Sequence, residues 1–166
     1  MSAVESLPLD LIIRDAGTQI RAKLDEDKIA EYAENLDEMP PVKLVYDGTS
    51  YYLWDGFHTT AAAERKGCAE VRAVVRAGTL RDAILLSLSA NHDHGIPRSQ
   101  EDKRRAVLRV LDDAEWSQWS NVAIAHACKV SHSLVYAMRK DVGQLTNVEQ
   151  HELIQVRKGL DGKTRK

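Results

Sequence analysis

The chain has 166 residues and a formal net charge of −2, with 43% hydrophobic and 29% charged residues. This length allows one compact domain, or a domain of about 110 residues followed by a small helical module. No apolar run approaches the roughly 18 residues that a membrane-spanning helix needs, and no charged leader precedes an apolar core. We therefore expect a cytoplasmic protein without a membrane partner.

Charge is distributed unevenly along the sequence. Residues 1–90 hold 10 Lys and Arg against 15 Asp and Glu, whereas residues 91–166 hold 13 against 10. A surface for nucleic acid is therefore expected in the C-terminal half. Cys68 and Cys128 are isolated in the sequence, so we predict two small buried side chains rather than a disulfide or a metal knuckle.

The first elements alternate between strand and helix. Residues 7–14 are rich in apolar, β-branched side chains and predict a short strand. Residues 25–38 predict a helix, because Ile29, Tyr32, Ala33 and Leu36 recur at helical spacing before a pair of prolines. Two further strands, at 42–46 and 50–54, are joined across Asp47-Gly48, a dipeptide typical of hairpin turns.

The remaining elements are mostly helical. A sharp turn at 55–57 leads into an Ala-rich helix that Gly67 closes, and a strand follows at 71–75. The spacing of apolar residues then predicts two helices, at 79–90 and 99–114.

Residues 120–140 predict two short helices joined by a tight turn, the layout of a helix-turn-helix. Ser120 and Ser131 can cap the helices. Inward positions are expected at Val122, Ile124, Ala125, Cys128, Leu134, Val135 and Met138. DNA contacts are expected from Ser131, His132, Ser133, Tyr136, Arg139 and Lys140.

Charge supports this interpretation, because residues 119–140 carry three cations and no carboxylate. Lys129 stands where Gly usually eases the corner, which a non-Gly residue can do at modest cost. An ordinary antiparallel helical hairpin is the alternative.

The turn at Gly56 is a second candidate site. A strand that turns at Gly into a helix exposes backbone N–H groups that attract anions. The side chains of His58, Thr59 and Thr60 can add donors to phosphate oxygens. The alternative is that Asp55 or Thr59 caps the helix and His58 is bonded locally.

Four segments, read in order, resemble the ParB/sulfiredoxin-like family, nearest to its short plasmid- and phage-borne members. They are RAKLDEDKIAEYAENL at 21–36, LWDGFHTTAAAERKG at 53–67, ANHDHGIPRSQEDKRRAV at 90–107 and WSNVAIAHACKVSHSLVYAMRK at 119–140. The resemblance implies an α+β fold: a small mixed-sheet domain followed by an all-α helix-turn-helix module. It also implies a pocket for CTP or ATP with Mg²⁺, formed by Arg21, Gly56, Phe57, His58, Asn91, His94 and Arg98.

The sequence departs from this family in three places. Phe57 stands where sulfiredoxins carry their reactive Cys, so that activity lacks its nucleophile. Thr59 replaces the usual Arg, which removes a cation from the phosphate site. The sequence ends soon after the helix-turn-helix, so we do not expect the long dimerisation domain, or the full partition function, of chromosomal ParB proteins.

An enzyme is the alternative function: an NTPase, a phosphotransferase, or a nuclease with Asp55, His58 and His94 around a divalent ion. A structural metal is not expected, because residues 91–94 have no partner motif. The basic run at 102–105 is either a solvated face or a contact to phosphate.

We therefore predict an α+β domain at 1–98, a helix-turn-helix module at 99–142, and a basic tail or short hairpin at 143–166. The favoured function is binding of double-stranded DNA, in the transcriptional regulation or plasmid-type partition of a mobile element. A homodimer on a two-fold site is expected, because one short recognition helix makes few contacts.

Overall fold

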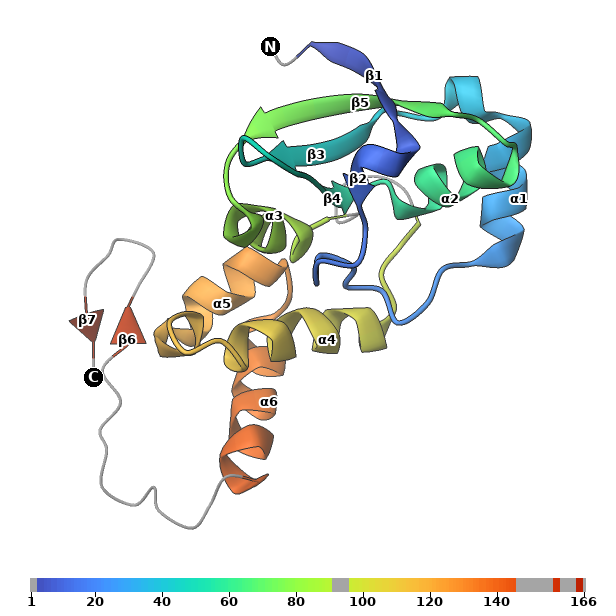
Figure 1. Ribbon diagram of the computed structural model, residues 1–166. Coiled ribbons are helices and arrows are strands. Elements are labelled where there is room, and N and C mark those ends of the chain that lie inside the picture. Colours follow the sequence, from blue (N-terminus) through green and yellow to red (C-terminus); the bar gives the residue numbers. More distant parts are fainter. Residues whose placement is uncertain (1–2, 91–95, 146–156, 159–163, 166) are drawn as a thin grey trace. The chain divides into compact units, whose positions relative to one another are not determined.

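The computed structural model describes residues 3–90, 96–145, 157–158 and 164–165. The chain divides into two compact units, residues 1–93 and residues 94–166. The first contains a sheet with three α-helices and the second is mainly helical (Figure 1). The α+β class predicted from the sequence is confirmed.

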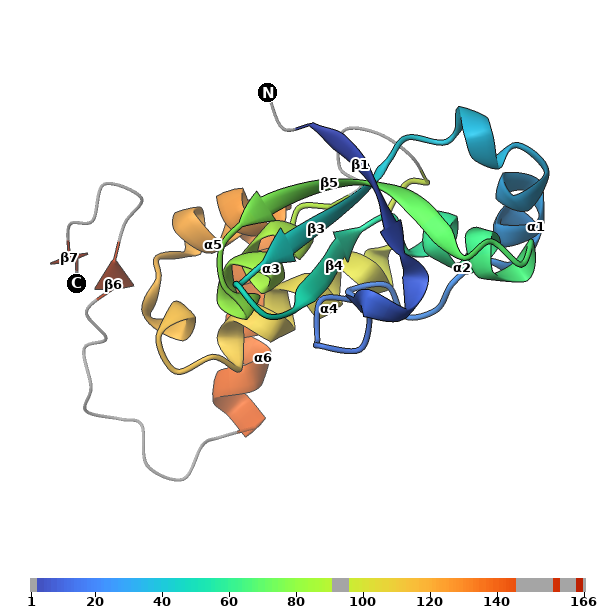
Figure 2. The ribbon, with the colours of Figure 1, turned by 45° about the horizontal axis from the view of Figure 1, so that its top comes forward.

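The sheet of the first unit has five strands in the order β1-β5-β3-β4-β2 (Figure 2). Neighbours β1 and β5, and likewise β3 and β4, are antiparallel, whereas β3 and β5, and β2 and β4, are parallel. The sheet is therefore mixed, as expected. The strands are β1 Val4–Pro8, β2 Ile12–Ile13, β3 Val42–Tyr46, β4 Tyr51–Asp55 and β5 Glu70–Ala77.

The single strand predicted at 7–14 is wrong. Pro8 has a φ of −56° and begins a 3-10 turn, Leu9–Leu11, that separates β1 from β2. The N–H of Leu9 donates to the carbonyl of Ala69 at 3.0 Å. The two short strands that result lie at opposite edges of the sheet.

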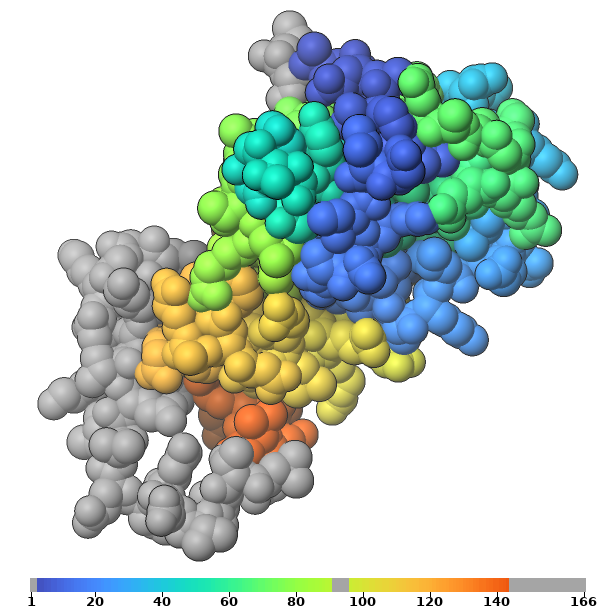
Figure 3. All heavy atoms as spheres, in the orientation of Figure 1, coloured from blue at the N-terminus to red at the C-terminus, as the bar shows by residue number. Residues whose placement is uncertain are grey.

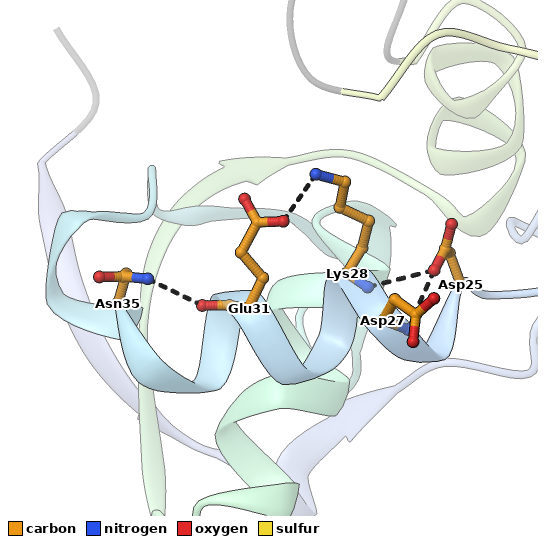
Figure 4. Close-up of polar contacts among 5 residues, drawn as sticks. All are labelled: Asp25, Asp27, Lys28, Glu31 and Asn35. Carbon is orange, nitrogen blue, oxygen red and sulfur yellow. Dashed lines mark hydrogen bonds and ion pairs between the residues drawn. The ribbon is translucent and has the colours of Figure 1, made fainter.

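Three α-helices accompany the sheet: α1 Glu26–Glu34, α2 Phe57–Arg65 and α3 Leu80–Ser87. The first is shorter than predicted, because Asn35 leaves helical geometry and its side chain donates to the Glu31 carbonyl at 3.0 Å. Figure 4 shows this end and the opposite end, where Asp25 accepts from the N–H groups of Asp27 and Lys28. Thr79 and Asp82 form a capping box at the start of α3.

One cluster of buried core residues in the first unit lies between the sheet and α2. Its buried members come from the strands, the turn after β1 and the middle of α2. In Figure 3 the N-terminal segment (dark blue) lies between the β3–β4 turn (teal) and α2 (green). The buried members of this cluster are Leu7, Leu9, Ile12, Val42, Leu44, Leu53, Ala63, Val71 and Ala73.

The second unit packs three helices against one another: α4 Gln100–Leu111, α5 Asn121–Cys128 and α6 His132–Leu145. A 3-10 turn, Trp116–Gln118, leads into α5, and Trp116 is buried against this bundle. Val122 was predicted to face inward but is 58% exposed, since it lies on the far side of α5 from Ile124.

Near the C-terminus, Arg157–Lys158 and Thr164–Arg165 form a small antiparallel pair, β6 and β7. Most of the basic tail or short hairpin predicted at 143–166 lies outside the described residues. Within the described ranges, no helix is long and apolar enough to cross a membrane.

Gly56 is required twice over. Its φ is +101°, and a Cβ there would lie 2.8 Å from Cγ1 of Val42. Gly48 has nearly the same φ, +100°, with nothing within 4 Å of its Cβ position. We predict that Gly48→Ala lowers the free energy of unfolding by about 1–2 kcal/mol, for backbone strain alone. Gly56→Ala should cost about 2–5 kcal/mol, because overpacking adds to the strain.

Urea unfolding followed by circular dichroism measures both changes. Equal losses in the two variants would contradict the close approach of Gly56 to Val42.

Candidate nucleic-acid interface

The turn between α5 and α6 is closed by backbone bonds. The N–H of Val130 donates to the Ala125 carbonyl at 3.0 Å, and the N–H of Lys129 donates to the His126 carbonyl at 3.3 Å. This pair is the Schellman pattern, with Lys129 in the left-handed conformation at φ 51° and ψ 54°. A short turn results, and α6 begins at His132. The two short helices joined by a tight turn that the sequence predicts are therefore present.

The outer face of α6 carries most of the predicted DNA-binding side chains. Ser131 accepts from the N–H of Leu134 at 3.3 Å, which confirms it as the cap. Val135 and Met138 are buried, so the helix turns the opposite side outward. The exposed residues on or beside that side are Ser131, His132, Ser133, Tyr136 and Lys140.

Arg139 does not lie on this outer face. Its guanidinium is half-buried and donates to three acceptors of its own unit. These are Oδ1 of Asn121 at 2.8 Å, the Ser117 carbonyl at 2.9 Å and the Trp119 carbonyl at 2.8 Å. Arg139 therefore fixes α6 against the start of α5, where the sequence predicted a contact to DNA.

The structural role of Asn121 was missed from the sequence. Asn121 is buried and directly follows Ser120, whose hydroxyl caps α5. Its Oδ1 accepts a hydrogen bond from the guanidinium of Arg139. A buried side-chain amide needs hydrogen-bond partners. A polar residue at the start of an otherwise apolar helix was the one signal that could have indicated it.

Arg98 belongs to the second unit. The sequence placed it in a nucleotide pocket, and its guanidinium donates to the carbonyls of Cys128 and Lys129, at 2.8 and 3.0 Å. It therefore touches the turn that precedes α6. Cys128 is buried, which raises the pKa of its thiol to about 12, and the charge of Arg98 opposes that rise. The predicted burial of this thiol is confirmed.

At the start of α2, in the first unit, several backbone N–H groups lack a partner within the helix. No side chain caps this end, and the first bond of the helix runs from the Thr60 N–H to the Gly56 carbonyl at 2.9 Å. The preceding N–H groups, of Phe57, His58 and Thr59, therefore have no partner within the helix. Neither Asp55 nor Thr59 acts as the cap that the alternative interpretation required.

The side chains at this turn face inward. His58 and Thr59 are each 7% exposed, and Thr60 is fully buried with its hydroxyl donating to the Gly56 carbonyl at 3.0 Å. Phe57 packs against the sheet core. An anion at this turn would therefore meet backbone donors rather than these side chains.

His58 links the first two helices. Its Nε2 accepts from the N–H of Asp25 at 3.0 Å, and its ring meets Tyr32 edge-on. An accepting Nε2 requires the neutral ring with its proton on Nδ1. Burial lowers the pKa of His58, and the nearby charge of Arg21 lowers it further, so the neutral form is maintained. This side chain is therefore structural at the entry to α1.

The other predicted pocket residues are only partly placed. Arg21 is half-buried and lies close enough to His58 to affect its pKa. Asn91 and His94 lie outside the described residues. Among the residues that are described, no three His, Cys, Asp or Glu gather as metal ligands.

Comparison with known proteins gives two regulators from Streptomyces. The transcriptional regulator NovG of Streptomyces niveus is 27% identical over 120 residues, which cover 72% of this chain and 36% of that protein. A possible regulatory protein of the streptomycin biosynthesis operon of Streptomyces griseus is 27% identical over 165 residues, covering 99% and 44%. The chain thus spans less than half of each relative. No protein-family model matches.

A solved structure supports the fold. The C-terminally truncated chromosome-partitioning protein ParB of Caulobacter crescentus, complexed to the centromeric parS site, matches with a TM-score of 0.56 and 17% identity. The match covers 84% of this chain and 72% of that one. The mixed sheet and helices thus define a protein with the ParB fold. The fold that the sequence motifs predicted is therefore confirmed.

Arg139 should stabilise the second unit. Arg139→Ala leaves Asn121 and two carbonyls without their donor, so we predict a loss of about 2–3 kcal/mol in the free energy of unfolding. Lys140→Ala, the neighbouring exposed cation, should change it by less than about 0.5 kcal/mol. Urea unfolding of both variants measures the difference in free energy of unfolding. Equal stabilities would contradict the stabilising role of the three Arg139 hydrogen bonds.

Proposed function

We propose that the protein binds double-stranded DNA through the outer face of α6 and acts as a ParB-like regulator. The observation that carries this proposal is the exposed face itself, from Ser131 to Lys140. It joins hydroxyls, an imidazole, a phenol and an ammonium on a helix that a tight turn sets against α5. Such donors and acceptors can reach base edges in a major groove, while cations contact phosphates.

Each exposed residue has a role that follows from its chemistry. His132, Ser133 and Tyr136 lie near the start of α6, the part of a recognition helix that contacts bases. Lys140 lies further along and has the reach and charge for a phosphate. Arg139 is not part of this surface, because its guanidinium serves the fold. Regulation is supported by the names of the two Streptomyces relatives, and partition of a mobile element by the ParB fold.

A homodimer follows from the size of the surface. One helix of this length offers too few base contacts for tight specific binding, so two copies on a pseudo-palindromic site are expected. A cytoplasmic location of the protein is a prediction from the sequence.

The start of α2 is proposed as a second, anion-binding site. The N–H groups of Phe57, His58 and Thr59 have no partner within the helix and favour a phosphate at this helix end. The side chains fit a nucleotide only in part, since His58 is engaged by Asp25 and Thr59 brings no charge. CTP or ATP would therefore be held mainly by backbone donors, with Arg21 nearby and Mg²⁺ carried on the phosphates.

DNA binding is tested by substitutions on α6. Lys140→Ala should flatten the slope of log affinity against log salt by about 0.9 on any sequence, which is the loss of one phosphate contact. Tyr136→Ala should cost about 1–3 kcal/mol on a duplex that the wild-type protein enriches from a random pool, and less on the pool itself. Fluorescence anisotropy measures both.

Lys66→Ala is the matched control, since Lys66 is an exposed cation of the first unit, and it should leave the slope unchanged. If the wild-type protein enriches no duplex, or if Lys140→Ala and Tyr136→Ala bind like wild type, the proposal is wrong.

Nucleotide binding is tested by calorimetry of the protein with CTP, ATP or GTP and Mg²⁺. We expect saturable binding of one nucleotide that Arg21→Ala weakens, because a cation beside the phosphates is then lost. Absence of binding by the wild-type protein would contradict a nucleotide site, and the first unit would then act as a scaffold.

A further inference from the structure

Arg98 connects two parts of the second unit, the start of α4 and the turn that follows α5. The residue after it, Ser99, caps α4 in a capping box: Ser99 Oγ accepts from the Asp102 N–H at 3.0 Å, and the Asp102 carboxylate accepts from the Ser99 N–H at 2.9 Å. Asp102 is only 5% exposed. The backbone at Arg98 is thereby held against the first turn of α4.

The guanidinium of Arg98 reaches the opposite end of a different helix. Its Nη2 donates to the carbonyl of Cys128, the last residue of α5, and to the carbonyl of Lys129 in the turn. The last carbonyls of a helix have no partner within the helix and carry partial negative charge. The guanidinium of Arg98 supplies both the hydrogen-bond donor that these carbonyls lack and a positive charge beside their partial negative charge.

The contact falls on a turn with left-handed backbone. Lys129 is the one non-glycine residue of the described chain with a positive φ. Three residues later α6 begins, so the conformation of this turn sets the direction of the helix. Base-edge contacts need their side chains held within about 0.5 Å and 10–20° of the productive geometry.

We propose that Arg98 is a positioning residue for DNA recognition: it ties the start of α4 to the α5–α6 turn and thereby sets the orientation of α6. This inference rests on the proposed function, since it assumes that α6 contacts DNA. Arg98 itself touches neither base nor phosphate. It acts through the carbonyls of Cys128 and Lys129.

The experiment compares single variants with a charge control and a rescue. The probes are the duplex that wild type enriches from a random pool and the unselected pool, followed by anisotropy over a range of salt. The variants are Arg98→Ala, Arg98→Lys, and the double variant Arg98→Ala with Lys129→Gly. Arg104→Ala is the control, because Arg104 is an exposed cation of α4, six residues from Arg98.

Arg98→Ala should weaken binding to the enriched duplex at least tenfold and binding to the pool much less, with the salt slope unchanged. Arg104→Ala should change affinity for the enriched duplex by less than threefold. Lys129→Gly should recover part of the loss, because Gly adopts the left-handed turn without help. If Arg98→Ala does not fold, Arg98→Lys should show the same selective loss to a smaller extent.

Three results would overturn the inference while leaving DNA binding in place. They are no loss in Arg98→Ala or Arg98→Lys, a loss equal to that of Arg104→Ala, or a salt slope flattened by about 0.9, which would mark a direct phosphate contact. A wild-type protein that enriches no duplex would instead contradict the proposed function, and this inference with it.

Discussion

The left-handed backbone at Lys129 is the constraint on which the second unit depends. It ends α5 within a single residue and lets α6 start after a turn of three. Two arginines act at the two ends of α5: Arg98 at the last carbonyls and Arg139 at the entry. The guanidinium groups of both arginines donate hydrogen bonds within the second unit. The outward face of α6 is left to short polar side chains, Tyr136 and Lys140.

In the first unit, the close approach of Gly56 to Val42 constrains the path of the chain in a similar way. Gly56 lies against Val42 with no room for a side chain, so β4 turns directly into α2. The residues that follow turn inward, and His58 holds the start of α1 through Asp25. Only backbone groups are then available at this helix end. A ligand site there would be built from the main chain, which explains how Thr59 can replace a cation without removing every phosphate donor.

Local signals in the sequence predicted much of this structure. The caps at Ser120 and Ser131 were readable because a capping hydroxyl acts within three residues. The hairpin at Asp47-Gly48 was readable because its turn chemistry is equally local. Where local chemistry decides the conformation, prediction and structure agree.

The errors concern contacts that the local pattern does not determine. A long guanidinium can reach acceptors far along the sequence, so helical periodicity could not tell that Arg139 bonds to Ser117 or that Arg98 bonds to Cys128. Apolar character misled at Val122, because an exposed valine carries no signature of its exposure. A 3-10 turn after Pro8 divides the apolar segment that was predicted as one strand. Its two parts, β1 and β2, therefore lie at opposite edges of the sheet.

The central claim is that α6 contacts DNA with its outer face. The most direct test is a titration of the isotope-labelled protein with a 20-base-pair duplex, followed by the backbone amide resonances. We predict that the shifts concentrate at residues 131–140, with Tyr136 and Lys140 among the largest. Shifts confined to the first unit, or none at a saturating concentration of duplex, would contradict the claim.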